Sequence, residues 1–555
     1  MPPATPDSTG TPRTAPMSSI GRAGVVIAAG TMVSRVTGLL RIIVLVVAIG
    51  SVGSRAADAF GVANQLPNNI YTIISTGILT AVIVPQIVKA SQNDDGGQAY
   101  ISKLFTLGTV VLLATTALAM IAAPWIVQLY APGFTGAQQA LAIALTYWCL
   151  PQIFFYGLYA LVGEALNARR IFGPFAWAPI INNIVSIAGF VVLIALFGTE
   201  LTQVSMWTPD MIALLGGTAT LGIVAQCVVL LLFWKRTGLS LRPDFRWRGV
   251  GLAQTGRLAG WTFLMVLAGQ FAGFVQSRVV SDASGDNVSI FALQNAWLLF
   301  MLPYSMIVLS IGTPYFTQLS EHAQAGKDEE VRNDIDRSIR TLGFFLAAAT
   351  AAVAAAAVPA SRVFTNSAAD AQAMAMVLLC YLLALWPMSI LFIVQRTFYA
   401  YGDTRTPFLF TVFQCALVIG TALGASALHA AGILPLQYLA LAVALGQSVA
   451  SIAQTIVASL LLRRKLGSIR SRDWMPALAR FAIAALPAGL AGWGAYLWLS
   501  GPEGWMTSGI LLGAVGSGVI ALIVLAVYLG LMALMRVPEL RTATTVLKRF
   551  LPGRG

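Results

Sequence analysis

Residues 24–50 read GVVIAAGTMVSRVTGLLRIIVLVVAIG, and this stretch decides the class of fold. An α-helix needs roughly 20 apolar residues to cross the hydrocarbon layer of a bilayer, so the stretch is long enough to span it. Similar runs recur along the whole chain of 555 residues, of which 57% are hydrophobic and 10% are charged. A soluble surface cannot be built from this composition. The sequence therefore predicts an all-α polytopic membrane protein.

Fourteen such apolar runs can be marked, which predicts 14 transmembrane helices. The runs cover residues 24–50, 67–88, 104–129, 138–165, 174–197, 212–234, 258–280, 289–318, 341–360, 371–395, 407–428, 434–462, 477–499 and 506–535. The hydrophilic connections do not exceed about 25 residues, which is too short for a folded domain with its own core. A large catalytic domain outside the membrane is thereby excluded.

The positive charges indicate how the chain is oriented. Of the 34 Lys and Arg residues, 29 fall on the side that contains both termini and three on the other side, namely Arg55, Arg278 and Arg362. Cytoplasmic connections of membrane proteins carry an excess of Lys and Arg. We therefore expect both termini in the cytoplasm. The net charge of +13 is then an orientation signal, and no nucleic-acid partner is expected.

The spacing of prolines suggests an internal duplication. Pro67 and Pro303 are 236 residues apart, and so are Pro151 and Pro387. Two lobes of six helices with one orientation, related by an axis normal to the membrane, are an architecture of transporters that hold substrate between the halves. The expected division is a disordered cytoplasmic tail (1–20), an N-terminal lobe (21–236), a basic linker (237–257), a C-terminal lobe (258–465), two further helices (466–540) and a basic cytoplasmic tail (541–555).

Arg35 and Arg41 are the first candidates for a binding site, because charge inside the membrane is costly and commonly functional. They are six residues apart in the first apolar run and therefore about 9 Å apart along a helix axis. Guanidinium groups suit phosphate oxygens, and a lipid-linked pyrophosphate is a fitting anion for a membrane cavity. The alternative is structural: Arg35 extends to the cytoplasmic face, and Arg41 pairs with a carbonyl or with Asp58.

Asp58 and several amides complete the candidate substrate-binding set. Asp58 lies just before the second apolar run, where it could contact substrate, cap a helix or pair with an arginine. Polar amides inside apolar runs could line a cavity wall or join helices by hydrogen bonds, and both interpretations stay open. The amides chosen as candidates are Asn68, Asn183, Gln276 and Asn295.

Other chemistries lack the residues that they require. Glu164 is the only carboxylate well within an apolar run, so paired acids for catalysis inside the membrane are missing. The four cysteines lie in apolar runs and the two histidines stand apart, which argues against a metal site. There is no phosphate-binding GxxxxGK[ST] loop. We expect a transporter and not an enzyme, with no cofactor and no metal.

Several short motifs resemble those of the MurJ/MviN lipid II flippases, a family of the multidrug/oligosaccharidyl-lipid/polysaccharide exporter superfamily. The carrying stretches are Ser34 to Arg41, Ala57 to Phe60, Leu66-Pro67-Asn68, Val84-Pro85, Leu166-Asn167, Leu302-Pro303, Thr313-Pro314, Arg396 to Ala400 and Asp403 to Pro407. Together they extend from about residue 24 to 410. Its departures from the family pattern resemble those of actinobacterial members.

The resemblance implies two six-helix lobes around a cationic cavity and two last helices forming a hydrophobic groove for lipid tails. It also implies a substrate, undecaprenyl-pyrophosphate-linked disaccharide pentapeptide, moved to the outer leaflet for peptidoglycan synthesis. The chain departs from better-known members where charge matters: Ile42 replaces an aspartate, Leu298 an arginine and Met301 a glutamate. Arg35 and Arg41 are the parts of the cationic cluster that carry over.

The predicted function is that of a lipid II flippase in the bacterial plasma membrane, working by alternating access. Its expected partners are lipid II or a related polyprenyl-pyrophosphate glycolipid, membrane lipids and cell-wall synthesis proteins. Two alternatives stay open. One is export of another polyprenyl-linked saccharide or of an amphipathic drug by the same architecture, and the other is a noncatalytic scaffold for the cell-wall machinery.

Overall fold

The computed structural model describes residues 19–76, 98–169, 171, 173–238, 240, 242–246 and 252–540. Regular structure in these ranges is helical, apart from an isolated bridge between Ser51 and Gly53. Thirteen helical stretches there are long and apolar enough to cross a membrane. The helix α2 occupies the place of the one remaining predicted span. The prediction of an all-α polytopic membrane fold is confirmed.

The main helices follow one another along the chain with short connections. They are α1 (Ser19–Ile49), α2 (Arg55–Ile74), α4 (Gln98–Tyr130), α5 (Gly136–Cys149), α6 (Gln152–Ala168), α7 (Gly173–Phe197), α8 (Pro209–Leu232), α9 (Leu252–Val280), α10 (Ile290–Pro303), α11 (Ser310–Gln324), α12 (Asp328–Ala355), α13 (Ala357–Arg362), α14 (Ala368–Leu382), α15 (Leu385–Ala400), α16 (Arg405–Ala430), α17 (Leu439–Leu466), α18 (Ser471–Leu499) and α19 (Ile510–Leu534).

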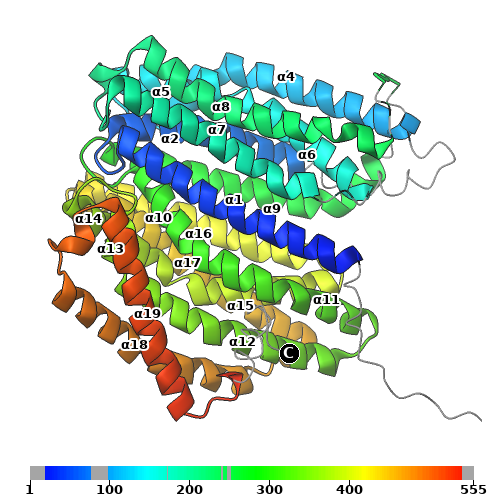
Figure 1. Cartoon of the computed structure of the whole chain (residues 1–555). Coiled ribbons are helices and arrows are strands. Elements are labelled where there is room, and N and C mark those ends of the chain that lie inside the picture. The colour runs from blue at the N-terminus through cyan, green and yellow to red at the C-terminus, as the bar shows by residue number, and fades with distance from the viewer. Residues whose placement is uncertain are drawn as a thin grey trace, which may run out of the picture.

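The helices gather into two groups by their packing. In the first helix group, α1 to α8, α7 packs on α1 and α8, α2 on α5, and α4 on α6. In the second helix group, α9 to α17, α16 packs on α9 and α17, and α11 on α12 and α15. Figure 1 shows the first group at the top and most of the second below it. The groups meet where α2 contacts α9 and α10.

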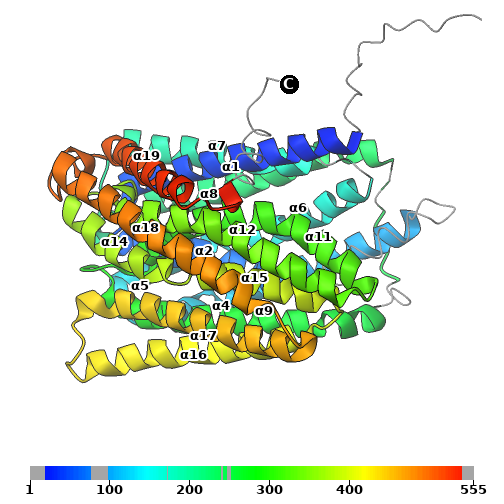
Figure 2. The same cartoon turned by 90° about the horizontal axis from the view of Figure 1, so that it is seen from below.

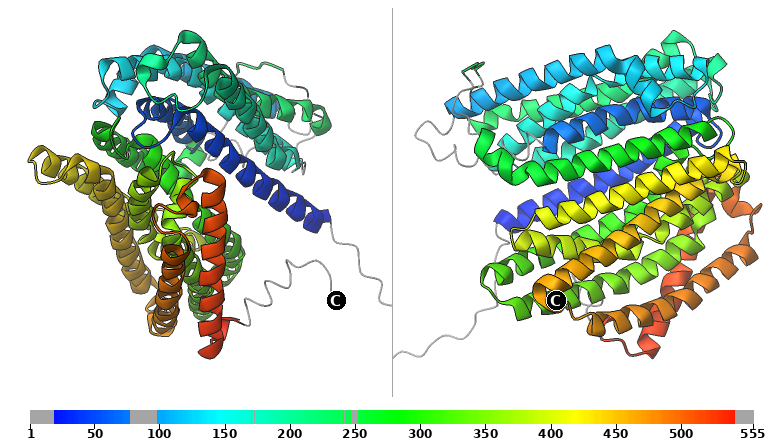
Figure 3. Two further views of the ribbon diagram at one scale, coloured as in Figure 1. Left: turned by 60° about the vertical axis from the view of Figure 1, so that its left-hand side comes forward. Right: turned by 180° about the vertical axis from the view of Figure 1, so that it is seen from behind.

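The last two long helices, α18 and α19, pack on each other and on α12, and α19 also packs on α13. They lie at the rim of the bundle, as Figures 2 and 3 show from different sides. Two hydrogen bonds attach this pair: the Tyr528 hydroxyl donates to the Phe344 carbonyl at 3.0 Å, and Arg362 Nε to the Thr507 carbonyl at 2.7 Å. The outer surface is apolar, with Trp498 85% and Leu534 80% exposed, as lipid contact requires.

Some predicted boundaries are wrong. The second span was expected at residues 67–88, but α2 begins at Arg55, and the ninth was expected at 341–360, but α12 begins at Asp328. Both helices begin with polar residues that lower local hydropathy, so an apolar window detects only their later turns. The start of α2 is marked by a helix cap, because the Ser54 hydroxyl accepts the Ala57 N–H at 3.1 Å.

Several predicted spans are broken near a proline. The fourth consists of α5 and α6, which are separated at Leu150 and Pro151, and the eighth continues from α10 through a π-helical turn, Tyr304–Leu309, into α11. Proline removes a backbone donor and displaces the preceding turn, so a single straight helix is unfavourable there.

Some predicted segments are corrected at their edges or lie outside the described residues. The expected disordered tail, residues 1–20, overlaps α1, which begins at Ser19, and the expected linker, 237–257, overlaps α9, which begins at Leu252. Residues 1–18 of the tail, the Val84-Pro85 motif and the basic tail at 541–555 lie outside the described ranges.

Candidate functional site

The bundle has two ends, and the hydrogen bonds between the helix groups gather at one of them. We call it the Asp58 end; it contains the connections at residues 50–54, 131–135 and 281–289 and lies on the left of Figure 1. The opposite end, which we call the Asp403 end, contains the connections at 325–327, 401–404 and 467–470. The candidate cavity lies between the two groups.

Asp58 joins the two helix groups directly. It stands in the first turn of α2 and is 1% exposed. Its carboxylate accepts the backbone N–H of Phe291, in the first turn of α10, at 2.9 Å, and the hydroxyl of Ser284 at 2.6 Å. A carboxylate at a helix N-terminus satisfies an unpaired N–H and is favoured by the helix dipole. Asp58 therefore caps a helix, but the helix belongs to the other group.

Further hydrogen bonds between the groups lie near Asp58. Gln138 Nε2 donates to the Ser284 hydroxyl at 2.7 Å and to the Arg55 carbonyl at 3.0 Å, so Ser284 is bound from two helices of the first group. The Gly133 N–H donates to the Ser281 hydroxyl at 3.1 Å. These bonds close the bundle at the Asp58 end.

A cavity of about 370 Å³, which we call the Arg41 compartment, lies between α1, α2 and α10. Three predicted residues line it: Arg41, Asn68 and Asn295. Arg41 is the one charged side chain among its described lining residues. Leu298, where the family resemblance predicted an arginine, is also part of the wall, so this position adds no charge to the compartment.

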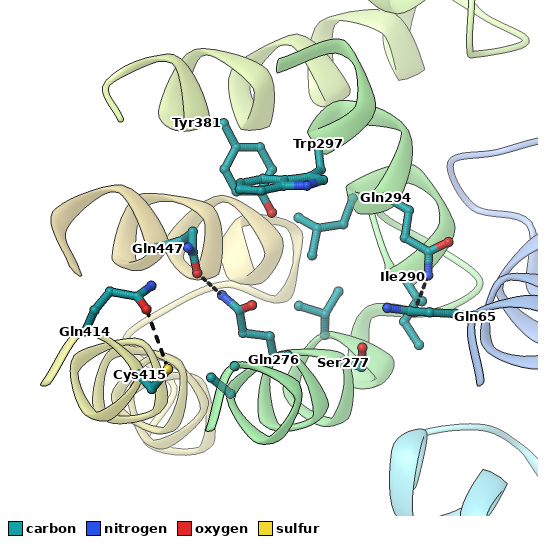
Figure 4. Close-up of a pocket in the computed structure, with 15 residues that line it drawn as sticks. Gln65, Gln276, Ser277, Ile290, Gln294, Trp297, Tyr381, Gln414, Cys415 and Gln447 are labelled. Carbon is teal, nitrogen blue, oxygen red and sulfur yellow. Dashed lines mark hydrogen bonds between the residues drawn. The ribbon is translucent and has the colours of Figure 1, made fainter. Parts of the chain in front are cut away.

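A second cavity of about 390 Å³, which we call the amide compartment, adjoins the first, because Gln65 and Gln294 line both. Figure 4 shows the predicted residue Gln276 on α9 pointing toward Gln447 on α17, and its Nε2 donates to Gln447 Oε1 at 3.2 Å. Gln294 Nε2 likewise donates to Gln65 Oε1 at 2.6 Å. No charged side chain is present among the lining residues that the structure describes.

Besides Asp58, two predicted residues have structural contacts outside both compartments. Asn183 Nδ2 donates to the Ser34 carbonyl at 3.0 Å and to the Thr37 hydroxyl at 2.9 Å, which joins α7 to α1. Arg35 is exposed and donates to the Ser305 hydroxyl in the π-helical turn of the other group. Arg35 therefore contacts the second helix group, whereas Arg41 faces the cavity.

Sequence reasoning missed several lining residues. Gln65, Gln414 and Gln447 line the amide compartment, and Tyr156 lines the Arg41 compartment. Gln414 and Gln447 are amides within apolar runs, so the criterion that selected Gln276 also applies to them. Tyr156 lies in an apolar run that contains several other aromatic residues, and nothing in the sequence distinguishes it.

The arrangement suits binding and movement of a ligand. One compartment offers a guanidinium and the other neutral amides. The Arg41 compartment is lined by both helix groups, and the amide compartment by the second group together with Gln65 of the first. Across the described ranges, no group of three His, Cys, Asp or Glu side chains could hold a metal ion.

Known proteins resemble this chain in sequence and in fold. The family described as lipid II flippase MurJ matches residues 46–529. A probable lipid II flippase MurJ of Haemophilus influenzae is 26% identical, with 85% of this chain and 91% of that protein covered.

Among solved structures, a lipid II flippase MurJ in an inward closed conformation superposes with a TM-score of 0.69 at 20% identity, covering 91% of this chain and 98% of that one. An inward-facing multidrug resistance MATE family transporter of the MOP superfamily gives 0.64 at 15% identity, covering 81% and 99%. These two likenesses concern the fold alone.

Proposed function

Since the chain belongs to the lipid II flippase MurJ family, we propose that it moves lipid II from the inner to the outer leaflet of the bacterial plasma membrane. It is a multi-pass membrane protein and, as a member of a transporter family, a transporter and not an enzyme. The substrate is the undecaprenyl-pyrophosphate-linked disaccharide pentapeptide, which peptidoglycan synthesis consumes outside the cell.

One observation carries the proposal: Arg41 is the charged side chain that faces the cavity between the two helix groups. A guanidinium offers a planar set of donors that matches phosphate oxygens. In an apolar membrane interior it attracts an anion more strongly than it would in water. Arg41 would therefore hold the pyrophosphate while Asn68 and Asn295 contact neighbouring polar groups of the headgroup.

Movement of the two helix groups would provide alternating access. We assign the first group to an N-terminal lobe (21–236) and the second to a C-terminal lobe (258–465). The Asp58 end faces the outside and both termini face the cytoplasm, in keeping with the 29 Lys and Arg residues that the sequence places on the termini's side. Segment 466–540, with α18 and α19, would guide the polyprenyl chain. Cell-wall synthesis proteins are proposed partners that consume the product.

The test is a leaflet-resolved assay of lipid II after depletion of the protein in its host, using an external agent that modifies only outward-facing headgroups. We expect protected lipid II to accumulate inside. Because Arg41 lines the cavity and Arg35 contacts Ser305, Arg41→Ala should fail to restore exposure, whereas Arg35→Ala should restore most of it.

Arg41→Lys is the matched control, because it keeps the positive charge but loses the planar set of donors. We expect partial activity from it. Unchanged exposure of lipid II on depletion, in cells without a second flippase, would contradict the proposal. Other polyprenyl-linked saccharides and amphipathic drugs would then be tested in the same assay. Impaired growth with normal lipid II exposure would favour a scaffold.

A further inference from the structure

The amide compartment has an unusual lining for a cavity in a membrane protein. Five glutamines, each from a different helix, line it, and no Lys, Arg, Asp or Glu is among its described lining residues. The glutamines are Gln65, Gln276, Gln294, Gln414 and Gln447. Buried amides are costly unless their donors and acceptors are bonded, so a lining of this kind suits an uncharged polar occupant.

The glutamines retain unused hydrogen-bonding capacity. The Gln276–Gln447 contact at 3.2 Å uses one N–H of Gln276 and the Oε1 of Gln447. In the described part of the chain, the amide N–H groups of Gln447 and the Oε1 of Gln276 have no other side-chain or backbone partner. Since an amide offers two donors and one acceptor oxygen, each pair can both donate to and accept from a bound group.

An aromatic pair forms another part of the wall. Trp297 of α10 and Tyr381 of α14 meet edge to face, with ring centroids 5.1 Å apart, and Figure 4 shows both beside the glutamines. Tyr381 is 4% exposed, and no partner for its hydroxyl is present within the described ranges. An apolar ring with a polar tip suits a ligand that has both C–H and O–H groups, as sugars have.

The compartment also has free space beside its backbone. Gly269 and Gly273 of α9 line it, and a Cβ added at either would meet no atom within 4 Å. The volume of about 390 Å³ is within the roughly 300–1,000 Å³ typical of small-ligand pockets. The compartment can therefore admit part of a ligand without displacing a helix.

We propose that the amide compartment binds the uncharged polar part of the transported headgroup, its sugar hydroxyls and carboxamides, and disfavours free carboxylates. This inference rests on the proposed function. The pyrophosphate would bind at Arg41, and the headgroup would continue past Gln65 and Gln294, which both compartments share. A carboxylate in the amide compartment would lie in an apolar medium with no cation in the described lining, and burial of an unpaired charge is strongly unfavourable.

The test compares two soluble headgroup analogues that lack the polyprenyl chain. Both are disaccharide pentapeptides, one with carboxamides and the other with free carboxylates on its side chains. Binding to the purified full chain is measured directly, for example by calorimetry. We expect the amidated analogue to bind roughly tenfold more tightly or better, because an unpaired buried charge costs more than a bonded amide.

Two variants examine whether this preference arises in the compartment. Gln276→Lys adds a cation and should reduce or reverse the preference, whereas Gln276→Met, of similar size and uncharged, should not reverse it. Gly273→Leu fills the free space and should weaken binding of both analogues. Gly260→Leu is its control, because Gly260 lies on the same helix outside the lining, and a Cβ there also meets no atom within 4 Å.

Equal affinities of the wild-type chain for the two analogues would overturn the inference, and so would a preference that none of the compartment variants alters. Transport is measured separately with the polyprenyl-linked forms of both headgroups in vesicles. Preferential binding without any transport would contradict the proposed function and leave the compartment's selectivity standing. Transport of both forms at equal rates with equal affinities would contradict the selectivity alone.

Discussion

The two ends of the bundle both carry a bonded carboxylate, but the bonds differ in what they join. At the Asp58 end, Asp58 of the first helix group accepts from Phe291 and Ser284 of the second. At the opposite end, Asp403 accepts the Thr406 N–H at 3.0 Å and the Lys465 ammonium at 3.2 Å, and all three residues lie within the second group. The first set must break if the groups separate, whereas the second can persist.

Hydrogen bonds between the two helix groups and hydrogen bonds within one group should affect different properties of the protein. A hydrogen bond that crosses between two moving bodies changes the balance between closed and open states, because it exists in only one of them. A bond inside one body contributes to stability in both states equally. Substitutions at the two ends should therefore be separable by measuring conformation and stability in the same preparation.

Replacing Asp58 should have the largest effect. Asp58→Ala leaves the Phe291 N–H buried without its acceptor, at a cost of about 1–3 kcal/mol to the closed state. A cost of 1.4 kcal/mol already changes the equilibrium about tenfold. We expect spin labels at Glu200→Cys and Asp286→Cys, both exposed in the wild type, to show a larger share of long distances.

The control for this substitution is Asp58→Asn, which keeps one acceptor oxygen and should shift the distances less. The labels require a background in which the four native cysteines are replaced. An unaltered distance distribution in Asp58→Ala would show that the contacts around it suffice to hold the end closed.

Replacing Ser284 should have an intermediate effect. Its hydroxyl donates to Asp58 and accepts from Gln138, so Ser284→Ala removes two bonds between the groups. Asp58 keeps the Phe291 N–H, and we expect about 1 kcal/mol of the closed state's advantage to be lost. The same label pair measures it, with Ser508→Ala as a control, since that exposed hydroxyl bonds only to the nearby Trp505 carbonyl. A shift as large as that of Asp58→Ala would place the principal contribution on Ser284.

Removal of the Arg35 side chain should have a smaller effect on conformation. Its bond to Ser305 crosses between the groups, but it is one bond where Ser284 forms two, and a single hydrogen bond contributes about 0.5–1.5 kcal/mol. In Arg35→Ala we expect label distances close to those of the wild type. If the Arg35–Ser305 bond is the important contact, Ser305→Ala should give the same label distances as Arg35→Ala. A strong shift in the distances of Arg35→Ala alone would show that the guanidinium acts through other contacts.

The smallest effect is expected at Asp403, and it concerns stability. Burial raises the pKa of Asp403, but hydrogen bonds from Thr406 and Lys465 outweigh it, so the pKa lies below its usual value. A lowered pKa stabilises the folded state above the unfolded pKa, near 3.9, and this contribution is lost as the pH falls through the folded pKa. Asp403→Asn should therefore lower thermal stability slightly at pH 7.

Thermal unfolding of Asp403→Asn and wild type at pH 7 and near pH 3 checks this. The difference should shrink at the lower pH, and the label distances at the Asp58 end should not change. A shift in those distances would show that the two ends are coupled.

The sequence was sufficient to predict the class of fold and some of the side chains that line the candidate site. Apolar runs are long and repeated, so thirteen spans could be located from hydropathy alone. Arg41, Asn68, Asn295 and Gln276 line the two compartments because polar groups inside apolar runs face protein or cavity. The fate of Asn183 could not be predicted, since an amide that joins helices and one that lines a cavity have the same local sequence.

The role of Asp58 required the structure. Its position before an apolar run is that of an ordinary cap for its own helix, but Ser54 already caps α2. The helix that Asp58 caps begins more than 230 residues later, and its hydrogen bond to Phe291 spans 233 positions. No local pattern indicates such a partner.

The π-helical turn at Tyr304–Leu309 gives the cavity wall a mechanical property. It connects α10, which carries Gln294 and Asn295, to α11, and it contains Ser305, the partner of Arg35. A π turn packs an extra residue into each hydrogen-bonded loop and is strained relative to an α-helix. Such a segment bends more readily than the straight helices around it. The turn can therefore act as a hinge, so that α10 and α11 tilt separately while each helix keeps its own packing contacts.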